Sequence, residues 1–159
     1  MPNLHLELQK LFPNDVLEVH AQHGYETAVI QRESIEKIAS YIKINDFFDF
    51  NVLMDLAGVD GYELKWKPRF EVVYHLYSTS KNHRLRLKIR TDEKDSVPTL
   101  TGLWPIANWF EREVWDMFGI QFEGHPDLRR ILLYPEFKGH PLRKDYQVNQ
   151  RHPLIGPKN

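Results

Sequence analysis

Charged side chains of both signs gather in a short stretch from Glu111 to Asp116, which also contains Arg112 and Glu113. If this stretch is helical, Glu113 and Asp116 share a face, whereas Glu111 and Glu113 do not. Two carboxylates on one face suit general acid–base catalysis. An ion-pair network in which Arg112 bonds Asp116 one turn on accounts for the same residues. We favour the network, because structural ion pairs are a common source of such clusters.

Histidines are the second group of residues that could take part in catalysis or bind a metal, and the chain has eight. His20 and His23 are three residues apart, a spacing that places side chains on opposite faces of a strand. His125, His140 and His152 each precede a proline, which favours an extended backbone. Because none of these spacings is that of a zinc site, we predict no metal ligands here. The three tail histidines are better interpreted as local anchors that hydrogen-bond along an extended path.

The sequence lacks the residues and motifs that several other functions require. The chain has no cysteine, which excludes disulfides, thiol catalysis and iron–sulfur clusters held by its own thiolates. It has no Gly-x-Ser-x-Gly motif and no glycine-rich phosphate loop. No apolar run approaches the roughly 18–20 residues of a membrane-spanning helix. The first residues carry no export signal, so a cytosolic protein is the default expectation.

Hydrophobic periodicity predicts an α+β fold, with a small mixed sheet, an N-terminal hairpin, packed helices and an extended C-terminal tail. In residues 34–43, apolar residues recur at the helical spacing, and Leu85, Leu87 and Ile89 alternate with basic residues as in a strand. We expect helices over 4–11, 34–43 and 105–118, a hairpin over 17–30, strands over 50–60, 69–78 and 84–90, and a helical turn within 97–103. Gly119 is placed to end the last helix.

A row of basic residues, Arg84, Arg86, Lys88 and Arg90, forms the other side of the strand over 84–90. Such a row could bind phosphate, anionic lipid or RNA. A solvated sheet face, or the protection of a sheet edge by charge, is the simpler interpretation and the one we favour.

The segment after Gly119 is irregular, because residues 119–159 hold five of the ten prolines and four of the eight glycines. The same segment contains large apolar side chains that need a surface to cover them. Residues 124–159 also carry seven Lys or Arg against three acids, which suits an acidic surface. We therefore divide the chain into a body, 1–120, and a partner-wrapping tail, 121–159, which we expect to become ordered on binding.

Arginine and tyrosine contribute strongly to protein interfaces, so the basic and aromatic positions of the tail are the candidate contacts. They are Arg129, Arg130, Leu142, Arg143, Lys144, Asp145 and Tyr146.

Residues 109–146 resemble the C subunit family of NADH–quinone oxidoreductase, the respiratory complex I. The resemblance lies in the stretches Trp-Phe-Glu-Arg-Glu from 109, Asp-Met-Phe-Gly-Ile from 116, Leu-Arg-Arg-Ile-Leu from 128 and Gly-His-Pro-Leu-Arg-Lys-Asp-Tyr from 139. Its structural signature comprises Glu111, Arg112, Glu113, Asp116, Phe118 and Gly119.

The resemblance implies a non-catalytic core scaffold subunit of the peripheral arm. Its tail would wrap the large D subunit near the quinone pocket, with the cluster-bearing subunits B and I as further partners. The chain itself would hold no cofactor, and the flavin and iron–sulfur clusters would lie in partner subunits. The complex passes electrons from NADH to quinone, translocates ions and lies on the cytoplasmic face of the inner membrane.

Three alternatives remain open. Related ferredoxin- or F420-dependent quinone reductases and membrane-bound hydrogenases use similar subunits. A free-standing enzyme would use Glu111, Glu113 or Asp116. An RNA-binding module would use the basic strand over 84–90.

Overall fold

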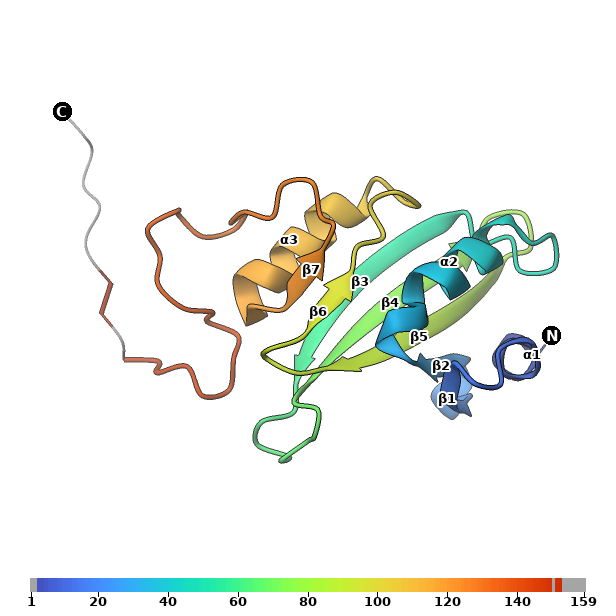
Figure 1. Ribbon diagram of the computed structural model, residues 1–159, viewed down its shortest axis with the longest axis horizontal. Helices are drawn as coiled ribbons and strands as arrows, with labels where there is room; N and C mark the ends of the chain where they lie inside the picture. The colour runs from blue at the N-terminus through green and yellow to red at the C-terminus, as the bar shows by residue number, and fades with distance from the viewer. Residues whose placement is uncertain (1–2, 150, 153–159) are drawn as a thin grey trace.

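The computed structural model describes residues 3–149 and 151–152, and a five-stranded mixed sheet forms its centre (Figure 1). The sheet order is β1-β2-β5-β4-β3, and a separate two-stranded sheet joins β6 to β7. The helices are α1 (Leu4–Leu11), α2 (Ile35–Ile44) and α3 (Ala107–Phe118), with short 3-10 turns η1 (Gln22–Gly24) and η2 (Arg32–Ser34). The strands are β1 (Val16–His20), β2 (Thr27–Ile30), β3 (Val52–Asp60), β4 (Phe70–Ser78), β5 (His83–Thr91), β6 (Ser96–Pro98) and β7 (Gln121–Glu123).

The predicted α+β class and the N-terminal hairpin are confirmed. Strands β1 and β2 pair antiparallel, and the connection turns at His23 and Gly24, which both have positive φ. Strand β2 then pairs parallel to β5, and the remaining neighbours in the sheet are antiparallel. Both outer strands are irregular, because the register shifts within β1 between Val16 and Glu18 and within β3 between Leu53 and Asp55.

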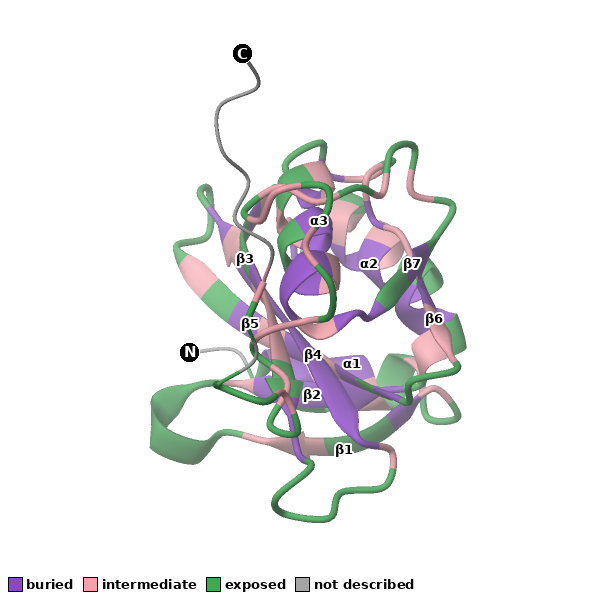
Figure 2. Cartoon of the chain, turned by 90° about the vertical axis from the view of Figure 1, so that its left-hand side faces the viewer, coloured by how far each residue is buried: buried purple, intermediate pink, exposed green. Residues whose placement is uncertain are grey.

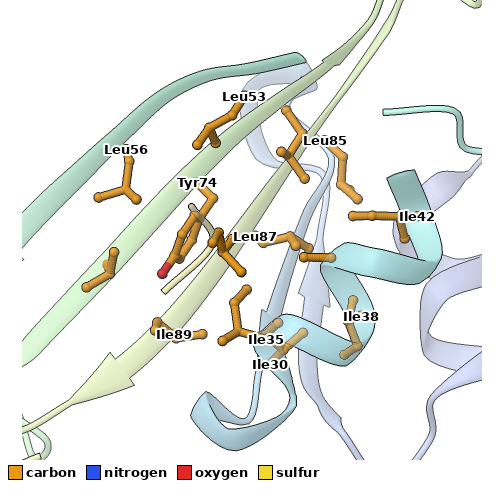
Figure 3. Packing of buried hydrophobic residues seen from close by; sticks show 14 of the residues in the cluster. Ile30, Ile35, Ile38, Ile42, Leu53, Leu56, Tyr74, Leu85, Leu87 and Ile89 are labelled. Carbon is orange, nitrogen blue, oxygen red and sulfur yellow. The ribbon is translucent and has the colours of Figure 1, made fainter. Parts of the chain in front are cut away.

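One face of the sheet carries the core. From α2, Ile35, Ile38 and Ile42 pack onto Leu85, Leu87 and Ile89 of β5 (Figure 3), and α3 contributes Val114 to the same cluster. Helix α3 also approaches β3 closely. A Cβ at Gly58 would lie 2.7 Å from the ring of Phe118, so a side chain at this position would force the two elements apart. Figure 2 shows buried residues concentrated along β4 and on the inner side of α3.

The other face of the sheet is uncovered by any helix that the structure describes. The basic row Arg84, Arg86, Lys88 and Arg90 lies on this face, as the alternation predicts, while the apolar residues of β5 are buried on the opposite side. The edge-protection interpretation is wrong, because β5 is the central strand of the five. The row therefore covers the middle of an open sheet face.

Strands β6 and β7 are absent from the sequence prediction. A helical turn is expected within 97–103, yet Val97 lies in β6 and pairs with Phe122 of β7, and the helical turn begins only at Leu100, whose carbonyl accepts the amide of Trp104 at 2.9 Å. Three-residue strands are too short to produce a periodic pattern, and the partner lies beyond α3 in sequence. None of the helices in the described residues is long and apolar enough to span a membrane.

The packing of α2 makes a testable prediction. Ile38 is fully buried, whereas Ile44 of the same helix is 76% exposed. Truncating Ile38 to alanine leaves a cavity, so we expect Ile38→Ala to lower the free energy of unfolding by about 3 kcal/mol in urea titrations. Ile44→Ala is the matched control, with an expected change below about 0.5 kcal/mol. Equal losses in the two variants would contradict this account of the core.

Candidate partner-binding site

The tail, 121–159, begins with β7. Its remaining described residues, 124–149 and 151–152, contain no helix or strand and pass around the C-terminal end of α3 (Figure 1). An irregular segment of this kind has to satisfy its backbone polar groups with side chains or water. Here the body supplies many of those partners. The tail is therefore held against its own chain, and the expectation that it becomes ordered only on a partner is wrong for these residues.

Asp116 is the first anchor, and its side chain is fully buried. One carboxylate oxygen accepts a hydrogen bond from Arg130 at 2.6 Å. The other accepts the successive amides of Ile131, Leu132 and Leu133 at 3.1, 2.9 and 3.0 Å. Burial alone would raise the pKa of Asp116, but the amide of Leu133, Arg130 and the other two amides outweigh it and lower the pKa. The carboxylate therefore stays charged and fixes this turn of the tail.

Arg130 extends the anchor along the tail. Its guanidinium donates to the carbonyls of Phe137 at 2.7 Å and Gly139 at 3.0 Å while it pairs with Asp116. The group also lies over the rings of Trp115 and Phe137, at 5.7 and 5.4 Å from their centroids. One side chain thus joins α3 to two turns of the tail.

Arg112 does not bond Asp116, and the predicted intrahelical pair is wrong. Its guanidinium instead donates to the backbone carbonyls of Arg129 at 3.1 Å and Arg130 at 3.0 Å. Arg112 and Asp116 of α3 therefore both turn toward the tail, where each bonds backbone groups of the irregular segment. The ion-pair network exists, but it joins the helix to the tail.

The tail also caps the end of α3. Gly119 ends the helix with a left-handed φ of 77°. The last three backbone carbonyls of the helix accept hydrogen bonds from the tail. The carbonyl of Asp116 accepts from the ring of His140 at 3.0 Å, and that of Met117 accepts from the amide of Leu142 at 3.1 Å. The carbonyl of Phe118 accepts from the guanidinium of Arg143 at 2.5 Å. Carbonyls at a helix end have no partners within the helix, and positive charge is favourable there. Burial lowers the pKa of His140, which favours a neutral ring donating through Nδ1.

A second anchor lies at the end of β3. Arg69 donates to both carboxylate oxygens of Asp60, at 2.9 and 2.7 Å, and to both of Asp145 in the tail, at 2.6 and 3.1 Å. Asp60 also accepts the amide of Lys144 at 2.8 Å, and Glu93 pairs with Arg69 as well. The hydrogen bonds of Asp60 and then Asp145 raise the pKa of Arg69. Nothing in the spacing of Asp60 and Arg69 points to this site, which sequence reasoning missed.

Glu111 is the remaining acid of α3 and is also fully buried. It accepts the amide of Leu100 at 2.7 Å and the hydroxyl of Thr99 at 2.5 Å, and Nε2 of His125 lies 4.0 Å away. Burial raises the pKa of Glu111 to about 7, against the effect of these hydrogen bonds. Glu113 is exposed on another face, so the acids of α3 do not meet as an acid–base pair.

The predicted contact residues divide into two groups. Arg130, Arg143 and Asp145 have side chains that anchor the tail to the body. Arg129 and Lys144 are exposed, and Leu142 is 51% exposed. Tyr146 is intermediate and its ring stacks on that of Phe137 at 6.3 Å between centroids. Leu132, which is 61% exposed, belongs with the outward group, although its exposure is not readable from the sequence.

The tail histidines form local hydrogen bonds at all three predicted positions. His125 bonds the carbonyl of Asn108 at 3.2 Å, and His140 bonds that of Asp116. His152 bonds the hydroxyl of Tyr146. Within residues 3–149 and 151–152, no three histidine, aspartate or glutamate side chains gather as a metal-binding group.

Comparison with known proteins finds relatives of this chain among respiratory-chain proteins. The chain is 44% identical over 146 residues to C subunit 2 of the NADH-quinone oxidoreductase of Rhizobium meliloti (strain 1021), covering 92% of this chain and 79% of the relative. It is 44% identical over 148 residues to the NADH-quinone oxidoreductase C subunit of Hyphomonas neptunium (strain ATCC 15444), covering 93% and 72%.

The fold is also similar to a solved chain of the membrane-bound sulfane sulfur reductase, an archaeal respiratory membrane complex. That similarity has a TM-score of 0.73 at 25% identity and covers 92% of this chain and 85% of that one. The family model of the respiratory-chain NADH dehydrogenase 30 Kd subunit matches residues 28–152. The chain therefore belongs to this family, as the resemblance in residues 109–146 predicts.

The first anchor can be tested by removing its carboxylate. We expect Asp116→Ala to lower the free energy of unfolding by roughly 3 kcal/mol, because it leaves Arg130 and three amides without their buried partner. Hydrogen exchange should accelerate at the amides of 131–133. Glu113→Ala, an exposed neighbour on the same helix, is the control and should leave both measurements near wild type. Unchanged protection of 131–133 in the Asp116 variant would refute the anchor.

The raised pKa of Glu111 predicts that the free energy of unfolding depends on pH with a sign opposite to that of an ordinary paired acid. Its folded pKa of about 7 lies above the ordinary value of 4.5. The folded state therefore binds the proton more tightly, and stability falls as pH rises from about 4.5 to about 7. Relative to Glu111→Gln, the wild-type free energy of unfolding should fall by on the order of 3 kcal/mol across that window.

Above about pH 8 that difference should be flat, because Glu111 is then ionised in both states. Glu113→Gln serves as the control and should reproduce the wild-type pH profile. Parallel profiles for wild type and Glu111→Gln would show that the pKa of Glu111 is not raised.

Proposed function

We propose that the chain is a non-catalytic core scaffold subunit of the peripheral arm of an NADH–quinone oxidoreductase and that its tail docks on the large D subunit beside the quinone-site module. The observation that carries the proposal is a tail held in shape by its own body while large apolar side chains point outward. A segment held in one conformation before binding loses less entropy when it binds. Anchoring on the chain's own body thus favours, rather than opposes, a role in assembly.

The outward side of the tail has the composition of an interface. Leu132 and Leu142 are exposed there, and Val148 is 99% exposed. Trp109 of α3 is 52% exposed, and the centroid of its ring lies 5.3 Å from the guanidinium of Arg112. That guanidinium also bonds the tail carbonyls of Arg129 and Arg130. Exposed apolar groups bordered by charged residues are typical of protein–protein interaction sites.

The proposed partners and the reaction of the whole complex are those that the family implies. The partners would be the large D subunit and the cluster-bearing subunits B and I, and the flavin and iron–sulfur clusters would lie in partner subunits, with none in this chain. The complex would transfer electrons from NADH to quinone and translocate ions at the cytoplasmic face of the inner membrane. We retain the division into a body, 1–120, and a tail, 121–159, as part of this proposal. The effect of the chain on catalysis would be indirect, through the position of the quinone site.

A second candidate is the equivalent subunit of a related respiratory complex with another electron donor. The observation that favours it is the fold similarity to the sulfane sulfur reductase chain at 25% identity. The greater identity to relatives named for NADH and quinone, 40–54%, favours the first candidate. The subunits that purify with the chain would distinguish the two.

The outward leucines test the docking of the tail. In the full chain, Leu132→Asp with Leu142→Asp should reduce co-purification of the large subunit about tenfold or more, because both place a charge in a desolvated contact. Leu64→Asp is the matched control, since Leu64 is 70% exposed on the β3–β4 loop. Both variants should keep the wild-type thermal unfolding curve. Full recovery of the large subunit with the double variant would reject the proposed docking surface.

A further inference from the structure

On the open face of the sheet, only half of the basic side chains of β5 are paired with an acid. We define it as the outward residues Glu71, Val73, His75 and Tyr77 of β4 with Arg84, Arg86, Lys88 and Arg90 of β5. Lys88 pairs with Glu71 at 2.8 Å, and Arg90 pairs with Glu18 at 3.1 Å. Arg84 and Arg86 form no ion pair with any residue that the structure describes. The uncompensated charge therefore lies at the end of the sheet where β5 begins.

Two tyrosine rings hold these free guanidinium groups in place. Arg84 lies over Tyr77 at 4.8 Å from the ring centroid, and Arg86 lies over Tyr25 at 4.9 Å. A guanidinium stacked on an aromatic face keeps its N–H groups directed outward along its edges, where a carboxylate can accept two of them. Nε of Arg86 is buried and has no acceptor in the described structure. A buried donor without an acceptor is costly, so Arg86 would gain from a small shift that turns this N–H toward an acceptor.

A hollow of about 570 Å³ opens over the same two arginines. Tyr25, Met54, Asp55 and His75 are among its other lining residues. Burial, and then the nearby Arg86, lowers the pKa of His75, against the effect of Asp55, so its ring is neutral and can exchange hydrogen bonds. The hollow thus combines two oriented cations, aromatic and thioether surface, and a hydrogen-bonding ring.

Two acidic residues at this hollow indicate which class of molecule can bind there. Asp55 lines the hollow, as does Glu26, which is engaged by His5 at 2.8 Å. These carboxylates repel the dense negative charge of a polyphosphate or a nucleic acid, whereas single carboxylates spaced along a chain can meet the arginines and avoid the acids. Arginine, tyrosine and methionine are enriched in protein interfaces.

We infer that the Arg84–Arg86 hollow is a second docking surface, which receives an acidic segment of another protein subunit through carboxylate–guanidinium pairs. It is separate from the tail. The tail anchor Asp60 and the hollow residue Asp55 are five residues apart on β3, or about 17 Å along a strand. The two surfaces thus lie toward opposite ends of the sheet, and the chain bridges two partners. The inference stands whether or not the tail docks on the large D subunit.

Zero-length cross-linking in the assembled complex tests the inference. A tagged chain with Arg84→Lys and Arg86→Lys is purified from its own cells with the subunits that accompany it and is treated with a carbodiimide, which joins a lysine amine to a contacting carboxylate. We expect a cross-linked peptide that connects position 84 or 86 to an aspartate or glutamate of another subunit. Lys88–Glu71 provides an internal control for the reaction, because that pair lies within the chain.

Recovery of the Lys88–Glu71 product without any link from positions 84 or 86 to another subunit would overturn the inference. Recovery of nucleic acid photo-cross-linked to the same segment would overturn it too, because it would assign the face to a different class of macromolecule.

Charge reversal gives an independent measurement. Arg84→Glu with Arg86→Glu should lower the recovery of the cross-linked subunit about tenfold and leave recovery of the tail's partner unchanged. Arg90→Glu is the matched control on the same strand, because Arg90 is already paired with Glu18. If the reversed chain does not fold, Arg84→Gln with Arg86→Gln replaces it, with a smaller loss expected. Equal recovery of the subunit with either double variant and wild type would contradict the inference.

Discussion

A buried carboxylate, that of Asp116, determines how the C-terminal third of this molecule is arranged. A charge removed from water is stable only when hydrogen bonds and an opposite charge replace its solvation. Within α3 no neighbour supplies these, so the tail has to do so, with three consecutive amides and Arg130. The arrangement is reciprocal. The amides belong to an irregular segment that has no sheet or helix to satisfy them, and the carboxylate is their acceptor.

Hydrogen bonds and ion pairs between the body and the tail recur along the rest of the tail. Arg112 and Arg130 donate to tail carbonyls, the residues from His140 to Arg143 satisfy the end of α3, and Arg69 links β3 to Asp145. A segment without regular secondary structure thus acquires a defined path from charged side chains of the body. This explains how proline- and glycine-rich sequence can present Leu132 and Leu142 at fixed positions.

The elements that local periodicity defines are predictable from the sequence. The helix over 34–43 and the strands over 69–78 and 84–90 each bury a regular set of apolar residues, and the structure places them within one or two residues of the expected bounds. Strands β6 and β7 depend on a pairing across α3, which no local pattern records. Of the acids of α3, Asp116 forms an ion pair with an arginine, but that partner, Arg130, lies 14 residues away in an irregular segment. Helical spacing suggests Arg112 in its place, because spacing describes only neighbours on one helix.

The two register shifts in the outer strands have a consequence for the chain before assembly. A straight, regular outer strand offers unpaired backbone groups to any similar strand, and identical copies can join through them into aggregates. The irregularities at Val16–Glu18 and Leu53–Asp55 bend the borders of the sheet and interrupt that template. A freshly synthesised chain that waits for its partners is thereby protected from polymerising with itself, while its broad sheet face stays available to them.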